Sequence, residues 1–377
     1  MWSTPSEVTK IELVEVVIDS VPEIVEVPIV VVKRFAESET QQVRKKLDSL
    51  LKRIHKRHDF NGSLLVAKAG KIMYSNQVGY ADFRKKKLLD ICDAFQLASV
   101  SKQFTAAAIM ILYERDLIRL SDTVNNYFPG FPYKGVTIQH LLNHTAGLPK
   151  YFWVAEHKWE HKNAPTNSEM MELLEASNVQ RFFRSGRNFD YSNTGYVVLA
   201  SIIEKVSGLR FGDFIEQNIF DPLGMDDSFV YSYENDAIKE HQLIGYRLYK
   251  GWRHLKINGT VNDAIVGDKN VYATTEDLFK WVEGLNSGKL LSKESLDKMY
   301  THGQTKYGRK VPYGFGFRLT KDKEKIYHYG KWNGFSTGII QYMKDDLVVI
   351  VLEHSSYTSM SYLNNKVKKI VSENFGV

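Results

Sequence analysis

The chain has 377 residues, of which 43% are hydrophobic and 25% charged, which is typical of a globular protein and excludes a disordered, collagenous or coiled-coil chain. No apolar run approaches the length of a membrane span, and the single cysteine, Cys92, excludes an internal disulfide and a cysteine-rich zinc module. The net charge is +6, and residues 1–33 hold six acids and two lysines, so the rest of the chain is strongly basic.

Residues 1–39 are expected to form an extended tail, and one edge strand within residues 1–33 is the alternative. Val and Ile alternate with Glu there, and Pro5, Pro22 and Pro28 interrupt the pattern. The basic segment and apolar core of a signal peptide are missing. Such a tail fits a stalk left after removal of a signal or anchor, and it equally fits an extension of a cytosolic protein. The sequence leaves both readings open.

The next segment, residues 40–57, is predicted to be an amphipathic helix. Val43, Leu47, Leu50, Leu51 and Ile54 recur at helical spacing, so the basic residues between them form a solvated face. A basic run is also found in nucleic-acid-binding proteins, but no nucleic-acid motif accompanies this one. No nucleic-acid partner is therefore expected.

The remaining pattern places strands at both ends of the folded region. Residues 61–82 read as a hairpin, residues 99–300 as mostly helices and loops, and residues 313–353 as strands at 313–319, 326–329, 337–343 and 347–352, followed by a helix over 361–373. The short turns imply antiparallel neighbours. We expect an α+β fold in which an antiparallel sheet is built from both chain ends and flanked by helices. One catalytic domain would span 40–377, with an all-helical subdomain inserted within 115–300.

Ser99 and Lys102 form the most informative pair. Residues three apart in a helix share a face, and the apolar run that follows them, Ala106 to Leu112, indicates a buried helix. A serine at a helix start has free backbone N–H groups beside it, where an oxyanion can form. Burial should lower the pKa of the lysine, which makes it a candidate base. The spacing alone also occurs by chance in many chains.

Two further stretches carry candidate groups. Tyr191 and Asn193 are two apart and point the same way in an extended segment, although a surface turn with Asn193 as a helix cap is the structural alternative. His328-Tyr329-Gly330-Lys331 ends a predicted strand. Glycine there lets a substrate approach the strand edge closely, and the next residue can donate an N–H to an oxyanion.

Together these elements resemble the serine β-lactamase and penicillin-binding-protein superfamily. Ser99–Lys102, Tyr191–Asn193 and His328–Gly330 stand in its order and spacing, and the Tyr-x-Asn form is similar to the class C branch with its DD-peptidase and esterase relatives. Further stretches are similar to that branch: Thr137–Leu148, Asp221–Met225 and Val271–Leu278.

The resemblance implies a serine hydrolase that works by two-step acyl transfer. Ser99 would be the acylated nucleophile, Lys102 would accept or relay its proton, and Tyr191 would act as general base and then as acid. Asn193 would hold the substrate amide, and the backbone N–H groups of Ser99 and Lys331 would form the oxyanion hole. No metal or cofactor is implied. The partner is a small-molecule or peptide substrate, and the oligomeric state is left open.

The third element departs from the usual Lys-Thr-Gly. His328, Tyr329 and Gly330 would still contact the substrate, but the histidine removes a permanent cation and the tyrosine replaces a small hydroxyl residue that helps to bind a carboxylate. The departure weakens the case for β-lactams and for peptides that end in free D-Ala, and it leaves room for an esterase, an amidase or a D-amino-acid peptidase. The enzyme types expected for the chain are a carboxypeptidase, a D-aminopeptidase or an esterase. The substrate is thus an amide or ester: a cell-wall-type D-amino-acid peptide, a β-lactam or a small ester. Relatives that act on cell-wall peptides work outside the cytoplasm, which favours export.

Three alternatives accompany this interpretation. A non-catalytic paralogue would bind a peptide or cell-wall ligand without turnover. Gly334–Gly338 matches the Gly-x-Ser-x-Gly elbow, but a strand is predicted after it where the elbow needs a helix. His157–His161 matches an inverted zinc motif, but Pro149 and Pro165 bracket a short segment and no third ligand suggests itself.

Overall fold

The computed structural model describes residues 37–161, 163–232 and 239–375. The chain divides into two units, Met1–Arg34 and Phe35–Val377, and the description below concerns the second. Of the tail expected over 1–39, residues 1–36 lie outside the described part. Residues 37–39 already belong to the first helix, where Glu37 and Glu39 supply the negative charge that a helix N-terminus favours.

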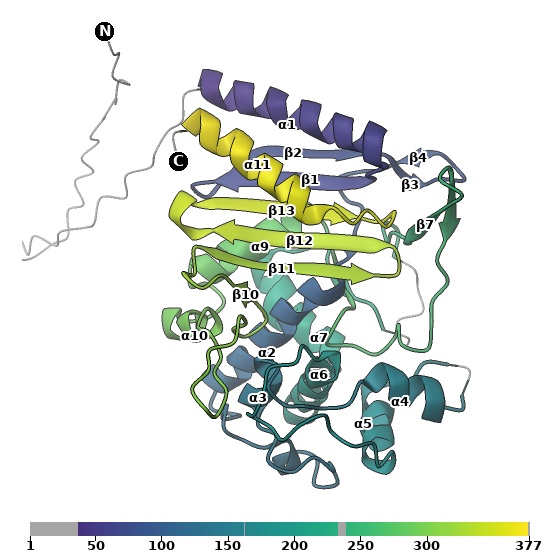
Figure 1. Cartoon of the computed structure of the whole chain (residues 1–377), viewed down its shortest axis with the longest axis vertical. Helices are drawn as coiled ribbons and strands as arrows, with labels where there is room; N and C mark the ends of the chain where they lie inside the picture. Colours follow the sequence, from purple (N-terminus) through teal and green to yellow (C-terminus); the bar gives the residue numbers. More distant parts are fainter. Residues whose placement is uncertain (1–36, 162, 233–238, 376–377) are drawn as a thin grey trace, which may run out of the picture. The chain divides into compact units, whose positions relative to one another are not determined.

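A six-stranded antiparallel sheet joins the two ends of the folded chain, in the order β10-β11-β12-β13-β1-β2 (Figure 1). β1 pairs with β2 on one side and with β13 on the other, so the N-terminal hairpin lies beside the last strand. The strands of this sheet are β1 (Gly62–Lys68), β2 (Lys71–Val78), β10 (Arg318–Leu319), β11 (Lys325–Trp332), β12 (Phe335–Tyr342) and β13 (Leu347–Glu353). The expected α+β fold class is confirmed.

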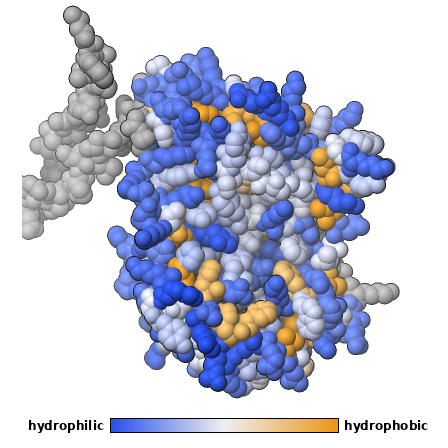
Figure 2. Space-filling view, in the orientation of Figure 1, coloured by the Kyte–Doolittle hydropathy of each residue, from blue (hydrophilic) through white to orange (hydrophobic). Residues whose placement is uncertain are grey.

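One face of the sheet is covered by α1 (Glu37–His58) and α11 (Met360–Phe375) (Figure 1). The buried stripe of α1 comprises Val43, Leu47, Leu50, Leu51 and Ile54, together with Thr40. Full burial of each aliphatic side chain contributes about 1.5–3 kcal/mol, which explains why a helix with so many cations folds onto the sheet. Figure 2 shows mostly hydrophilic side chains around these two helices, as expected for their solvated face.

The other face packs against the helical part of the chain and carries the larger core. Its central element is α2 (Lys102–Glu114), in which every residue from Lys102 to Leu112 is buried. A 3₁₀ turn, η1 (Ala98–Ser101), leads into it. The other helices are η2 (Val124–Asn126), α3 (Ile138–Leu142), α4 (Tyr151–Lys158), α5 (Asn167–Ala176), α6 (Asn193–Ser207), α7 (Phe211–Ile215), the π turn η3 (Glu216–Phe220), α8 (Asp221–Leu223), α9 (Thr275–Asn286), α10 (Lys293–Met299) and η4 (Met343–Asp345).

Seven short strands complete the described part of the fold. Three form a small sheet in the order β5-β9-β6, and the others pair in hairpins. These strands are β3 (Tyr80–Asp82), β4 (Lys87–Leu88), β5 (Phe95–Gln96), β6 (Phe229–Val230), β7 (Tyr246–Tyr249), β8 (Arg253–Lys256) and β9 (Val271–Ala273). β6 to β9 lie within 115–300, so the expectation that the part inserted there is all-helical is wrong.

The strand predicted over 313–319 is wrong for its first five residues, because β10 contains only Arg318 and Leu319. Gly316 has φ +80°, which L side chains rarely adopt, and a Cβ there would lie 2.9 Å from the Lys102 carbonyl oxygen. The segment is therefore a loop pressed against the start of α2. This contact brings the loop to the Ser99 site.

Candidate active site

Ser99 and Lys102 lie together at the start of the buried helix. Lys102 Nζ donates to Ser99 Oγ at 3.3 Å and to the Asp268 carbonyl oxygen at 2.8 Å. The lysine side chain is fully buried, and desolvation lowers its pKa to about 8, although the nearby Asp268 carboxylate opposes that shift. A serine hydroxyl thus faces an amine whose pKa lies much closer to neutral pH than that of an ordinary lysine, which is the arrangement of an activated nucleophile.

The backbone around Ser99 is held from two sides. Ala98, just before it, has φ +49°, a strained conformation for a residue with a Cβ. Ser101 Oγ accepts from the Val271 N–H at 3.0 Å, and Thr337 Oγ1 donates to the Leu97 carbonyl at 2.6 Å. Bonds to β9 and β12 therefore maintain the strained turn that presents Ser99.

Tyr191 lies over Lys102, just before α6. Lys102 Nζ is 5.1 Å from the centroid of its ring, and the Arg318 guanidinium carbon is 5.0 Å from the same centroid. The phenol oxygen is buried and has no hydrogen-bond partner among the described residues, although Ser99 is near enough to lower the pKa of the phenol. Burial raises the pKa of Tyr191 well above its usual value, and Ser99 and Arg318 only partly oppose this. The phenol therefore keeps its proton at neutral pH.

Asn193 is the first residue of α6, and the cap of that helix is Ser192, whose hydroxyl accepts from the Gly195 N–H. The Asn193 side-chain oxygen is buried without a hydrogen-bond partner among the described residues. The neighbouring Thr194 Oγ1 accepts from the Tyr151 N–H at 2.9 Å and donates to the Pro149 carbonyl. The start of α6 is thus held in place, and the side-chain oxygen of Asn193 remains able to accept a hydrogen bond from a ligand.

His328 is buried behind Tyr191. Its Nδ1 lies 2.8 Å from the Tyr329 carbonyl oxygen, which only accepts, so Nδ1 carries the proton and Nε2 accepts from the Tyr313 hydroxyl at 2.9 Å. Burial, followed by the charges of Lys102 and Arg318, holds the pKa of His328 well below its usual value. Both ring nitrogens are occupied, so a neutral His328 supports the site from behind and does not present a nitrogen to substrate.

Gly330 fits closely against the nucleophile segment. A Cβ at this position would lie 2.2 Å from the Leu97 carbonyl oxygen and 2.9 Å from the Ser99 nitrogen, so only glycine fits. Lys331 has an exposed side chain, and it directly follows Gly330, which lies against this turn. The backbone N–H groups expected to form the oxyanion hole therefore belong to neighbouring segments.

Tyr329 lies on the opposite face of β11. Its hydroxyl accepts from Asn364 Nδ2 of α11 at 3.2 Å, and its ring packs against the core beneath α1 and α11. This placement differs from the expected contact with substrate. Successive side chains of a strand alternate in direction, so His328 and Gly330 face the Ser99 side and Tyr329 cannot.

Two residues near Tyr191 had no role assigned from sequence. His144, which has φ +59°, accepts the Ser192 N–H on Nδ1 at 3.1 Å, and its carbonyl accepts the Asp190 N–H at 2.9 Å. Its ring centroid lies 4.2 Å from that of Tyr191. His144 thus grips the backbone on both sides of Tyr191. Its place in the Thr137–Leu148 stretch was the available signal.

Arg318 is the other residue, and it belongs to the two-residue strand β10. It forms no ion pair with another described residue, and its guanidinium lies over the rings of Tyr191 and Tyr313. Nothing in the sequence around it separates it from the other arginines. Arg318 restores beside Tyr191 the positive charge that a neutral His328 does not supply.

The two competing motifs lie elsewhere. Ser336 is the second residue of β12, and the strand continues to Tyr342, so no helix directly follows it as the elbow requires. α4 ends at Lys158, so His157 and His161 do not share a helical face, and His157 Nδ1 lies 2.9 Å from the Trp153 carbonyl oxygen.

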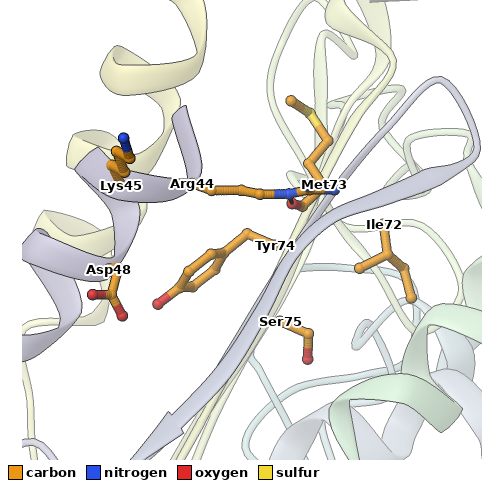
Figure 3. A pocket seen from close by; sticks show the side chains of 7 residues that line it. All are labelled: Arg44, Lys45, Asp48, Ile72, Met73, Tyr74 and Ser75. Atoms are coloured by element: carbon orange, nitrogen blue, oxygen red, sulfur yellow. Dashed lines mark hydrogen bonds between the residues drawn. The ribbon is translucent and has the colours of Figure 1, made fainter. Parts of the chain in front are cut away.

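A groove of about 470 Å³ lies between α1 and β2 (Figure 3). Arg44 Nε donates to the Met73 carbonyl across it at 2.8 Å, and the ring of Tyr74 points toward Asp48. α1 covers the face of the sheet opposite to α2, so this groove is not part of the Ser99 site (Figure 1).

Comparison with known proteins is decisive at the level of the family. Residues 47–371 match the β-lactamase family. The chain belongs to this family. It is 36% identical over 326 residues to penicillin-binding protein 4* of Bacillus subtilis, covering 83% of this chain and 72% of that protein.

Solved structures agree with the family. The crystal structure of a penicillin-binding protein from Bacillus halodurans is 25% identical, with a TM-score of 0.72 over 86% of this chain and 99% of that one. An octameric penicillin-binding-protein homologue from Pyrococcus abyssi is 26% identical, with a TM-score of 0.74 over 88% and 77% of the two chains. The resemblance seen in the sequence is confirmed, and the β-lactamase family is one of serine hydrolases that act by acyl transfer. Among the described helices, none is both long and apolar enough to cross a membrane.

Proposed function

We propose that this chain is a serine hydrolase that forms a covalent acyl-enzyme on Ser99 from an amide or ester substrate. The observation that carries the proposal is the 3.3 Å contact between Ser99 Oγ and Lys102 Nζ, with the amine fully buried and held by the Asp268 carbonyl. An amine with a pKa of about 8 is neutral in roughly a tenth of molecules at neutral pH, enough to serve as a base.

In the acylation step, Ser99 Oγ attacks the substrate carbonyl and its proton passes to Lys102 Nζ. The carbonyl oxygen becomes an oxyanion that accepts hydrogen bonds from the backbone N–H groups of Ser99 and Lys331. The carbon–leaving-group bond then breaks, and the leaving nitrogen or oxygen takes up a proton. Water repeats the sequence on the ester and frees Ser99.

The raised pKa of Tyr191 favours a division of roles in this step. A phenol that holds its proton at neutral pH is a poor first base, whereas Lys102 gives up its proton readily. We therefore assign proton abstraction from Ser99 to Lys102, and donation to the leaving group to Tyr191, which then recovers its proton from Lys102. Asn193, with its unpartnered oxygen, orients an N–H of the substrate.

The leaving-group side of the site is positively charged. Arg318 forms no ion pair among the described residues and lies beside Tyr191. A substrate whose leaving group carries a carboxylate is therefore attracted to this side of the site. We propose a carboxypeptidase-like or esterase-like substrate with such a group. A peptide with a free C-terminal carboxylate should be cleaved faster than its amide, and equal rates would exclude this role of Arg318. Action outside the cytoplasm, as expected from the sequence, stays a prediction.

The test of the nucleophile is the mass of the intact protein after incubation with a penicillin and, separately, with a fluorophosphonate. We expect an adduct with at least one probe in the wild type and in Ser336→Ala, and none in Ser99→Ala. Ser336 is a matched control because its buried hydroxyl has no partner among the described residues, so its removal breaks no hydrogen bond. An adduct that persists in Ser99→Ala would refute the assignment, and an unmodified wild type would favour a paralogue that binds ligand without turnover.

A further inference from the structure

A cluster of aromatic rings around a buried cation lies next to the Ser99 site. Lys269 Nζ is 5.3, 5.6 and 5.4 Å from the ring centroids of Tyr151, Phe152 and Trp332. It also pairs with the Asp268 carboxylate at 3.2 Å and donates to the Tyr151 hydroxyl at 2.7 Å. Phe152 and Trp332 stack with centroids 5.2 Å apart and planes 9° from parallel. Both are only partly buried, so the stacked pair reaches the surface.

Each of the three motifs of the site is connected to this cluster through a residue next to it, or two away from it, in the sequence. The Asp268 carbonyl holds Lys102, and Lys269 is the next residue. Tyr151 donates its N–H to Thr194, which follows Asn193. The third link is β11, in which Trp332 comes two residues after Gly330.

The order of residues along β11 shows on which side of Ser99 the aromatic cluster lies. Gly330 faces the Ser99 nitrogen, and Trp332 projects from the same face about 7 Å further along the strand. In the other direction, Arg318 is paired with Tyr327 of β11. A substrate lying along this edge across Ser99 therefore meets a cation at one end and the stacked rings at the other.

The position of Trp332 is fixed by polar contacts. Its indole Nε1 and the side chain of Asn333 both donate to Asp263 Oδ1. Asp263 is almost fully buried, and its carbonyl accepts from Asn270 Nδ2. The ring face is thus held in place before any ligand arrives, which lowers the entropic cost of binding an apolar group against it.

We propose that Phe152 and Trp332 form a subsite for an aromatic side chain on the acyl part of the substrate. The proposal rests on the function proposed above and names the substrate class of the same site. A flat apolar group gains contact with two rings whose orientation is already set, whereas a methyl group reaches little of that surface. Lys269 polarises both rings from beneath and is not itself exposed to the substrate.

The experiment compares hydrolysis of p-nitrophenyl phenylacetate with that of p-nitrophenyl acetate, as the ratio of their kcat/KM values. The wild type should prefer the phenylacetyl ester, and Phe152→Leu and Trp332→Leu should each lower the ratio about 5- to 10-fold. Trp332→Phe keeps a ring and should retain most of the preference. Trp153→Ala is the matched control, since Trp153 is the next residue on α4 and 45% exposed, and its ratio should equal that of the wild type.

The outcomes separate the two proposals. If the ratio of the two kcat/KM values stays at its wild-type value in both leucine variants, the aromatic subsite is overturned while Ser99 chemistry stands; an equal fall for both esters counts as this result. The acetyl ester also reports folding, since a misfolded variant loses both activities. A wild type that reacts with neither ester and carries no acyl group on Ser99 overturns the proposed function, and the subsite with it.

Discussion

Replacing Arg318 by Gln should shift the pH dependence of acylation to higher pH. Lys102 must be neutral to take the proton of Ser99, so the rate should rise with pH, with a midpoint near the Lys102 pKa of about 8. The positive charge of Arg318 disfavours the ammonium form of Lys102. Its removal therefore raises the pKa of Lys102 and moves the midpoint upward.

The structure sets the size of this shift. The two cations lie 5.0 and 5.1 Å from the same Tyr191 ring centroid, so their charges are at most about 10 Å apart. At an effective dielectric constant of about 20, unit charges at that distance interact by about 1.7 kcal/mol, or roughly 1.2 pKa units. Because Arg318 is partly exposed to solvent, we expect about 0.5–1 unit.

The assay is kcat/KM for a neutral ester, measured from about pH 6 to about pH 10. A neutral ester avoids the contact with a substrate carboxylate, so only the effect on Lys102 is read. Arg318→Lys keeps the charge and should leave the midpoint near that of the wild type. Raising the salt concentration should shrink the difference between wild type and Arg318→Gln, because the Debye length falls below the separation of the charges. A midpoint that moves to lower pH in Arg318→Gln, or an equal shift in both variants, would refute the reasoning.

Three further predictions concern the turn of Ser99, the segment of Tyr191 and a buried carboxyl group of the sheet. Gly330→Ala should lower the acylation rate at least about 100-fold, because the added Cβ displaces the Ser99 turn. Gly208→Ala is the control: Gly208 has φ +72° and no atom near the position of a Cβ, so thermal melts should show a loss of about 1 kcal/mol of stability and kinetics should show an unchanged acylation rate. His144→Phe removes the acceptor of the Ser192 N–H and should slow acylation about 10-fold, while His144→Asn keeps an acceptor and should recover most of the rate; equal rates in the two variants would contradict this role. Burial raises the pKa of Glu353 to about 8, so only the unfolded state loses that proton between about pH 4.5 and 8. Over this range the free energy of unfolding, measured by urea titration, should therefore fall by a few kcal/mol more in the wild type than in Glu353→Gln; an equal dependence of that free energy on pH in the two proteins would contradict the prediction.

Several features of this protein are local in the chain and could be predicted from its sequence. Ser99 and Lys102 meet because three residues make about one helical turn, and the apolar residues after them require burial. The stripe from Val43 to Ile54 defines α1 by itself. Short turns define the hairpins that build the antiparallel sheet. Periodicity and turn length depend on residues close together in the chain, so they can be read from the sequence without knowing the tertiary contacts.

Other features depend on contacts between distant segments, and only the tertiary structure decided them. Asp268 reaches Lys102 across 166 residues, and Arg318 reaches Tyr191 from a strand that the pattern had placed too early. Alternation along β11 separates Tyr329 from its neighbours but does not say which face meets Ser99. That choice is made by the packing of α11 against one face of the sheet and of α2 against the other, where the burial of two hydrophobic cores outweighs the preference of any single side chain.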